Sequence, residues 1–372
     1  MAHSSSQLIQ LKGTIVAPTT AHLVGSINLP DAETTFRTVS QHLGDRLPRI
    51  PDGEVGDRFY WIQFQKDFFD VTEGLSRVGD SPVYIRERFD TRPLRIDESV
   101  DPLELALPPL GYADAALESY ATFARLKAEG VIPPATRFQV SLPTPAGVVG
   151  SFFVPESRAD FEPVYESALM DELRRILDGI PHDQLAIQWD TALEFGMLEQ
   201  AEIRGNRITA WFGSNHDAIL AGVIERGVRQ AAAVPADVEV GYHLCYGDVE
   251  EHHFVEPADA TMLAEVAGGL FAASPRPITW MHLPVPIDRD DDAYFAPLAS
   301  VTWPAGTEIY LGLLHHEDGV DGALRRAATA GHVVPAFGVA TECGFGRGPR
   351  ERTVALLDLH EAVASDLAGE PQ

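Results

Sequence analysis

The feature that most constrains this chain is a regular alternation of short apolar runs with longer segments of helical periodicity. Each run is almost continuously apolar, without the two-residue alternation of a strand that faces solvent on one side. Runs of this kind are typical of parallel strands covered by helices. The eight candidate strands are His22–Ile27, Arg49–Glu54, Arg137–Leu142, Leu185–Asp190, Val238–Cys245, Ile278–Leu283, Glu308–His315 and Val333–Thr341.

Segments with apolar residues three and four positions apart lie between these runs and predict connecting helices. Eight strands alternating with helices predict an α/β fold, a (β/α)8 TIM barrel, as one domain over residues 21–368. An open doubly wound sheet is the competing architecture, although no G-x-G-x-x-G sequence follows the first strand. The predicted helices are Asp31–Leu43, Arg158–Leu177, Asn215–Ala233, Asp259–Ala273, Gly319–Ala330 and Pro349–Leu367.

Two segments fall outside this pattern. Residues 1–20 lack the charged and apolar regions of a signal peptide, and we expect them to form an N-terminal arm. Residues 55–136 are too long for a βα loop, and within them Val83–Ile96 has the alternation of a hairpin while Tyr112–Glu129 has helical periodicity. We expect this insertion to cap one mouth of the barrel, because no Gly/Ser-rich or Pro-rich linker separates it as a domain.

Charge and cysteine content limit the classes of partner. The chain has 55 acidic residues against 28 lysines and arginines, a formal net charge of −27. Nucleic acids and anionic membrane surfaces require clustered cations, so we expect neither as a partner. Two cysteines cannot form a disulfide framework for 372 residues, which favours a reduced, cytoplasmic compartment. No apolar run reaches 18 residues, so the sequence predicts no membrane span. With nucleic acids and membrane surfaces not expected as partners, we expect a small-molecule substrate.

Polar side chains stand at nearly every strand end, where the catalytic groups of such barrels lie. A buried polar group without a partner costs roughly 1–3 kcal/mol, so a shared polar pocket is the simpler explanation. Two carboxylates with few cations among these ends would suit a substrate ammonium group or a metal ion. The residues are Ser26, Asp52, Glu54, Ser141, Thr144, Asp190, His243, Cys245, Met281, His282, His315, His316, Glu342 and Cys343.

His243 and Cys245 are two positions apart in a predicted strand, so their side chains point to one side. An imidazole and a thiolate suit Zn²⁺, and Cys343 would supply a third ligand once the barrel closes. The alternative is that the cysteines are small buried residues and His243 is a hydrogen-bonded core histidine. Of His315 and His316, one is expected to face the pocket, where it could donate or accept a proton near neutral pH.

The residues described above resemble a known family. The His243-x-Cys245 sequence, Glu342-Cys343-Gly344 and Val24-Gly25-Ser26 are similar to motifs of the C-terminal catalytic barrel of cobalamin-independent methionine synthase. The resemblance extends from about His22 to Leu367, and the N-terminal half of the full-length synthase has no counterpart here. In that family, zinc binds homocysteine sulfur as a thiolate, which attacks the methyl group of a folate donor. The resemblance implies that His243, Cys245 and Cys343 are zinc ligands.

The resemblance also implies roles in substrate binding. Val24 and Ser26 would contact the amino acid from the end of the first strand. Glu54 and Asp190 would hold the substrate amine, although Asp190 alternatively caps the following helix. Ser141 begins Ser-Leu-Pro-Thr-Pro at the position of the family's folate-side loop, which differs in sequence.

Two further positions relate to the resemblance. One of His315 or His316 is similar to the family histidine that protonates the leaving group. The family's fourth zinc ligand is a glutamate at the end of strand six, where this chain has Met281 and His282. His282 is therefore the candidate fourth ligand, unless that position is open to water or substrate.

The combined prediction is a zinc-dependent methyl or alkyl transferase that activates a thiol substrate, with a folate-type compound as a possible donor. A zinc lyase or hydrolase that uses metal-activated water is the alternative. A metal-free barrel of the related porphyrin decarboxylase branch is least favoured, because that branch needs arginines and the strand ends offer none.

Overall fold

Eight parallel strands form one sheet whose two edges meet. The computed structural model describes residues 20–82, 84–85, 88–203, 206–247 and 252–369. The strands of this sheet are β1 (Ala21–His22), β2 (Arg49–Pro51), β7 (Arg137–Pro143), β8 (Leu185–Thr191), β11 (Glu239–Leu244), β12 (Trp280–Pro284), β13 (Glu308–Leu314) and β14 (Gly338–Thr341). Their order is β1-β14-β13-β12-β11-β8-β7-β2, and all neighbours are parallel.

A parallel bridge between Ser26 and Gly53 joins β1 to β2 just beyond their ends. The backbone N–H of Ile27 donates to the carbonyl of Gly53 at 3.0 Å across this bridge. The sheet is thus a nearly closed barrel, which confirms the predicted (β/α)8 fold and excludes the open doubly wound sheet.

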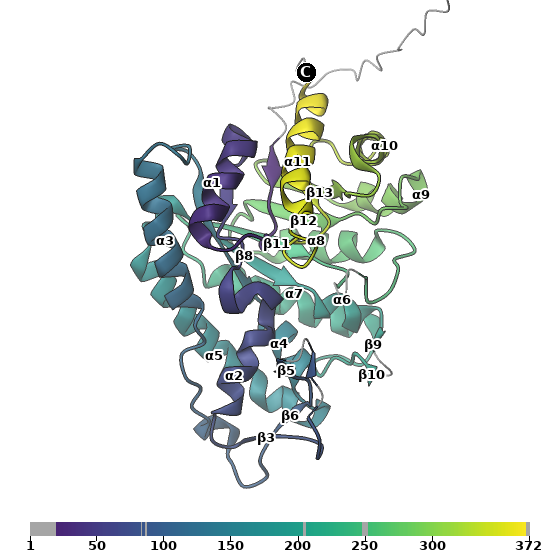
Figure 1. Cartoon of the computed structure of the whole chain (residues 1–372). Helices are drawn as coiled ribbons and strands as arrows, with labels where there is room; N and C mark the ends of the chain where they lie inside the picture. The colour runs from purple at the N-terminus through teal and green to yellow at the C-terminus, as the bar shows by residue number, and fades with distance from the viewer. Residues whose placement is uncertain (1–19, 83, 86–87, 204–205, 248–251, 370–372) are drawn as a thin grey trace, which may run out of the picture.

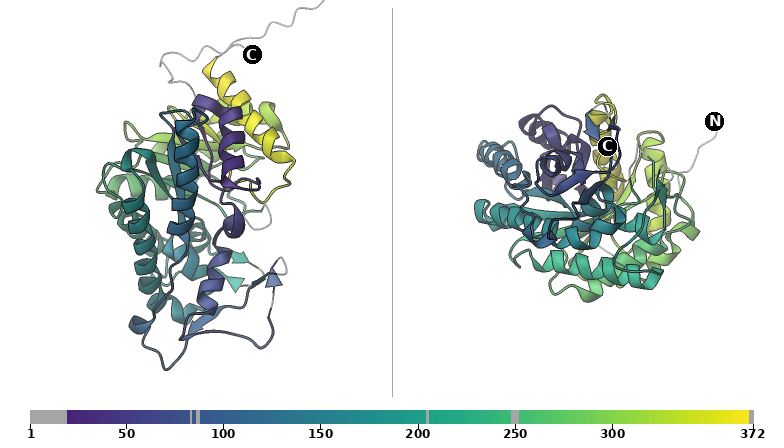
Figure 2. Two further views of the ribbon diagram at one scale, coloured as in Figure 1. Left: turned by 60° about the vertical axis from the view of Figure 1, so that its left-hand side comes forward. Right: turned by 90° about the horizontal axis from the view of Figure 1, so that it is seen from below.

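Seven long helices of the described chain surround the sheet (Figures 1 and 2). The last of them packs against the first, so the helical layer closes as the sheet does. Phe36, Phe123 and Phe138 pack edge to face or tilted between the first two helices and β7. No described helix is long and apolar enough to cross a membrane. The helices are α1 (Ala32–Leu43), α3 (Tyr112–Ala128), α5 (Pro155–Gly179), α7 (His216–Ala232), α8 (Thr261–Ala273), α10 (Gly319–Ala330) and α11 (Arg352–Ala368).

Side-chain caps begin two of these helices where the sequence indicates. The Asp31 carboxylate accepts from the Thr34 N–H at 2.7 Å at the start of α1, and Asn215 caps α7 in the same way. The last strand is shorter than predicted, because Val333 and Val334 both donate to the carbonyl of Ala330 and continue the turn after α10. Pro335 then lacks the N–H that a strand would need.

Residues 55–136 form two structural parts. The first contains η2 (Gly56–Phe64), α2 (Gln65–Asp70), the antiparallel pair β3 (Leu75–Arg77) and β6 (Leu94–Ile96), and the hairpin β4 (Tyr84–Ile85) and β5 (Phe89–Asp90). The second is α3, which packs against α1, α5 and β7 and so belongs to the helical layer of the barrel. Val83, Arg86 and Glu87 of the predicted hairpin lie outside the described residues.

Two ion pairs made by one buried arginine lie at the end of the barrel where the strands begin. Arg49, at the start of β2 and 1% exposed, pairs with Glu239 at 2.7 Å and with Glu308. Its guanidinium lies 4.3 Å from the ring centroid of Trp280. The cavity described below lies at the opposite end, where the strands finish.

Candidate metal centre and substrate cavity

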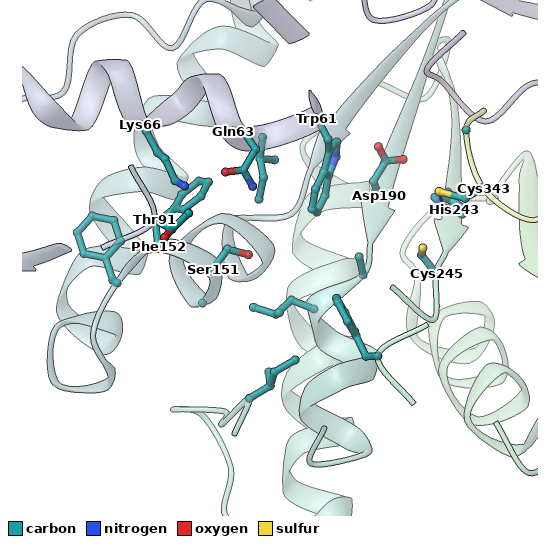
Figure 3. Close-up of a pocket in the computed structure, with 18 of the residues that line it drawn as sticks. Trp61, Gln63, Lys66, Thr91, Ser151, Phe152, Asp190, His243, Cys245 and Cys343 are labelled. Carbon is teal, nitrogen blue, oxygen red and sulfur yellow. Dashed lines mark hydrogen bonds between the residues drawn. The ribbon is translucent and has the colours of Figure 1, made fainter. Parts of the chain in front are cut away.

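A cavity of about 630 Å³ opens where the strands end. Its walls come from the residues after β1, β2, β8, β11 and β14, from η2 and α2, and from α4 (Pro145–Phe152). Figure 3 shows two different ends: His243, Cys245 and Cys343 at one, and Lys66 and Phe152 at the other, with Trp61 and Gln63 between them.

Strand register explains why polar residues meet at the first end. His243 of β11 is the register partner of Asp190 on β8 and of His282 on β12. These three residues therefore lie at one level of the barrel. Cys245 follows β11, and Cys343 follows β14 across the barrel.

The structure brings His243, Cys245 and Cys343 together. Their potential ligand atoms all lie within 4.8 Å of one another, and the Cys343 Sγ is 3.6 Å from the His243 Nε2. Zinc with bonds of about 2.3 Å to sulfur and about 2.0–2.1 Å to nitrogen, in tetrahedral geometry, separates its ligand atoms by roughly 3.6–3.8 Å. The donor set and its spacing therefore fit a zinc ion with small adjustments.

His282 takes a different position from the one expected of a fourth ligand. Its Nε2 lies 3.0 Å from the carbonyl of Thr341, and its Nδ1 lies 2.7 Å from the Nδ1 of His243. A carbonyl only accepts, so the proton of His282 is on Nε2 and its Nδ1 accepts from the His243 Nδ1–H. The His243 Nε2 is then left with its lone pair toward Cys343, as a metal ligand requires.

Both imidazoles are neutral at physiological pH, which this arrangement requires. Burial is the largest cause that lowers the pKa of His282, to about 3. Burial, the neighbouring His282 and the charge of Arg347 hold the pKa of His243 well below its usual value. With both ring nitrogens hydrogen-bonded, His282 has none left for a metal ion.

Two glycines allow the loop that carries Cys343 to lie against the end of β1. A Cβ on Gly344 would overlap Ser26 Oγ, and one on Gly346 would lie 2.7 Å from Ser26 Cβ. The Ser26 hydroxyl accepts from the Gly346 N–H at 3.3 Å. Ser26 thus lines the cavity and also holds the loop that carries Cys343 in place.

Glu342 fixes the same loop from its other side. Its carboxylate contacts the Nε2 of His253 at 2.9 Å, and this hydrogen bond and charge raise the pKa of His253 to about 9, against the effect of burial. The ion pair connects the end of β14 to the segment that follows β11.

Glu54 and Asp190 form a carboxyl pair in the same cavity wall as His243, Cys245 and Cys343. Burial raises the pKa of Glu54 to about 7, with Asp52 adding to the rise and Arg58 opposing it. Burial and the charge of Glu54 raise the pKa of Asp190 well above its usual value. Near neutral pH the pair therefore carries less than two full negative charges, and a cation between the carboxyl groups would be stabilised.

The backbone around Glu54 holds its carboxyl group in place. Glu54 has a φ of 50°, in the region that favours glycine, and its N–H donates to Asp52 at 3.0 Å. Asp52 in turn pairs with Arg58 at 2.5 Å. A Cβ on Gly25 would overlap the Glu54 carboxylate, so a larger residue at this position would displace that side chain.

Val24 and Ser141 serve mainly to hold the floor of the cavity. The Val24 carbonyl accepts from the side chains of Gln139, Ser141 and Gln188. Gln188 also donates to the Asp190 carboxylate at 2.9 Å. Val24 lines the cavity, whereas Ser141 is in the layer beneath it, and the Val24 carbonyl already has three donors.

His315 and His316 are not among the described residues that line the cavity. The Nε2 of His315 donates to the carbonyl of Val285 at 2.8 Å, and burial lowers the pKa of the ring. His316 is exposed. Neither histidine lines the cavity, contrary to the prediction from the strand-end pattern.

Several residues that line the cavity were not predicted from the sequence. Trp61 has a φ of 53°, unusual for a bulky residue, and its side chain lies beside Asp190, whose pKa it lowers (Figure 3). Lys66, Arg158, Arg207 and Arg347 also line the cavity, which corrects the expectation of few cations. All five lie outside the eight strands of the barrel, so the strand-end pattern did not indicate them.

Comparison with known proteins shows the fold. No family model matches the chain, and no curated protein matches it either. A B12-independent methionine synthase from Shewanella sp. W3-18-1, in complex with selenomethionine, is 14% identical, with 95% of this chain and 98% of that chain covered and a TM-score of 0.57. A Listeria monocytogenes protein named as a vitamin-B12-independent methionine synthase is 15% identical, with the same coverage and a TM-score of 0.55. The chain therefore shares its fold with cobalamin-independent methionine synthase-like proteins.

Proposed function

We propose that this protein is a zinc-dependent transferase that passes a methyl or other alkyl group to the thiol of an amino acid. The observation that carries the proposal is the group formed by His243, Cys245 and Cys343, whose ligand atoms lie within 4.8 Å at the wall of a ligand-sized cavity. Three protein ligands and one open position are typical of catalytic zinc sites. The shared fold with methionine synthase-like proteins supports the same class of reaction.

His243, Cys245 and Cys343 would hold the zinc ion, which supplies Lewis acidity that keeps a bound thiol deprotonated near neutral pH. His282 would act on His243 alone, by accepting the Nδ1 proton and keeping the Nε2 lone pair directed at the ion. Two thiolates neutralise the charge of Zn²⁺, which favours a soft sulfur donor in the open position over water.

Glu54 and Asp190 would bind the ammonium group of the substrate. Their raised pKa values show that neither carboxylate has enough cationic partners to offset its burial. An ammonium group between them would supply that charge and orient the substrate toward the metal-ligating residues. The amino acid bound in the Shewanella structure is consistent with a substrate of this kind.

A zinc lyase or hydrolase remains the second candidate, with the open position used by water. A ligand role for His282 would favour this candidate, because a more cationic site better acidifies bound water, but both nitrogens of that ring are already hydrogen-bonded. A folate-type donor has no separate support in the described residues. His315 and His316 receive no role in the cavity.

The proposal is tested with protein in which cobalt replaces the metal, because cobalt–thiolate bonds absorb light. We expect homocysteine to change the visible spectrum and homoserine, which has oxygen in place of sulfur, to leave it unchanged. Cys245→Ser should weaken metal binding and abolish the response, whereas Glu54→Gln should keep the metal and weaken homocysteine binding. Equal responses to both compounds would contradict the proposal and favour the water-based alternative.

A further inference from the structure

The two ends of the cavity differ in charge. The described lining includes four cationic side chains, Lys66, Arg158, Arg207 and Arg347, and two carboxyl groups, Glu54 and Asp190. The chain as a whole has about twice as many acidic as basic residues. Both carboxyl groups lie near the metal-ligating end, and Lys66 lies at the opposite end (Figure 3).

Lys66 is the most informative of these cations. It belongs to α2, is 4% exposed, and its ammonium group lies 5.1 Å from the ring centroid of Phe152. Among the described residues it makes no hydrogen bond and no ion pair within 4.0 Å. A buried ammonium group without an anionic partner is costly. Consistent with this, burial and Arg77 lower the pKa of Lys66 to about 8, although Asp90 and Asp70 oppose the change.

The chain offers an internal comparison, because it has only three lysines. Lys127 donates to the carbonyl of Thr136 at 2.7 Å and to the side chain of Gln184 at 2.5 Å. Its ammonium group thus has the partners that Lys66 lacks. In a sequence with so few lysines, a buried one that faces a cavity is a strong sign of a ligand contact.

Neighbouring groups extend the same surface. The side-chain oxygen of Gln63, also in the lining, is buried and has no hydrogen-bond partner among the described residues. The Nε of Arg158 donates to the carbonyl of Phe153, next to the ring that Lys66 contacts, and Arg158 pairs with no carboxylate in the described chain. This end of the cavity therefore presents hydrogen-bonding capacity and positive charge around an aromatic surface.

We propose that the Lys66 end of the cavity is an anion subsite that binds a negatively charged group on the distal end of an elongated, partly aromatic ligand. The ammonium group of Lys66 forms the ion pair, Phe152 packs against the apolar body of the ligand, and Arg158 adds positive charge beside Phe153. Under the proposed function this ligand is the alkyl donor or the acceptor, but recognition of the anion needs no metal ion.

The test compares 3-phenylpropionate with 3-phenylpropionamide, which differ mainly in charge. We expect the wild-type protein to bind the acid at least tenfold more tightly than the amide, because a buried charge-assisted hydrogen bond is lost with the amide. Lys66→Met should remove this preference and Lys66→Arg should retain most of it. Lys127→Met, which also removes one positive charge, should leave the preference unchanged.

A second measurement does not depend on the variants folding. The three lysines are labelled by reductive ¹³C-methylation, which keeps their charge, and their NMR signals are followed during titration with 3-phenylpropionate. The Lys66 signal should shift while the Lys127 signal does not. Failure of the acid to bind, equal binding of acid and amide by the wild type, or an unchanged preference in Lys66→Met would each overturn the proposal.

The same titrations in zinc-loaded and chelator-treated protein separate this inference from the proposed function. A preference for the acid that persists without metal supports the anion subsite whether or not the protein proves to be a zinc enzyme. If homocysteine gave no spectral change while the preference for 3-phenylpropionate over the amide remained, only the proposed transferase activity would be rejected.

Discussion

Replacement of His282 by leucine tests how the barrel prepares a metal ligand. The substitution removes two buried hydrogen bonds, at 2.7 Å to His243 and 3.0 Å to Thr341, at nearly constant side-chain volume. His243 then loses the acceptor that keeps its proton on Nδ1. Loss of an outer-shell partner of this kind typically reduces metal affinity about 10–100-fold, or roughly 1.4–2.8 kcal/mol at about 1.4 kcal/mol per tenfold change.

Zinc affinity is measured at pH 7.5 by competition with a chromophoric chelator. We expect His282→Leu to bind zinc 10–100-fold more weakly and His282→Gln, whose amide retains one donor and one acceptor, to recover part of the loss. His315→Leu is the matched control, because His315 is largely buried and hydrogen-bonded but lies outside the cavity lining. A folded His282→Leu protein with zinc affinity within twofold of wild type would refute the proposed role of His282.

Three further outcomes are expected. In Gly25→Ala the new methyl group overlaps the Glu54 carboxylate, so we expect that carboxylate to move by about 1 Å. Turnover should fall roughly 10²-fold, and metal analysis should show unchanged zinc content. Because the pKa of Glu54 is raised to about 7 from an ordinary value of 4.5, its contribution to stability is present below pH 4.5 and lost as the pH rises to about 7. Urea unfolding at pH 4.5 and 7.5 should therefore show a smaller decrease in stability for Glu54→Gln than for wild type. Arg49→Met should remove the buried cation that pairs with the partly exposed Glu239 and Glu308, while Glu239 keeps its pair with Arg137. We expect the fold to lose roughly 1–3 kcal/mol of stability, and a loss below about 0.5 kcal/mol in the same assay would contradict this.

The strands and the meeting of His243, Cys245 and Cys343 at one end of the barrel could be predicted because both depend on local pattern. Continuous apolar runs marked the strands, and the closing of a parallel barrel places residues such as Cys245 and Cys343 at one end whatever lies between them. The role of His282 could not be predicted in the same way. It depends on the exact register of β11 with β12 and on the Thr341 carbonyl, and neither has a signature in the sequence.

The cavity wall opposite the candidate metal ligands could not be predicted from the sequence either. Trp61 and Lys66 belong to short helical turns whose position depends on tertiary packing, and Arg158 is in a helix that periodicity places only on the outer layer. His315 was a candidate to face the cavity but does not line it. A polar residue at a strand end suggested a pocket, but its hydrogen bond to Val285 satisfies it within the fold.

The central claim is that His243, Cys245 and Cys343 together hold one zinc ion, and metal stoichiometry tests it most directly. Protein purified without added metal is analysed by native mass spectrometry beside elemental analysis. We expect one zinc ion per chain, lost in Cys343→Ser and in Cys245→Ser but retained in His315→Leu. A metal-free wild-type protein that fails to take up zinc, or full zinc retention when both cysteines are replaced, would contradict the account.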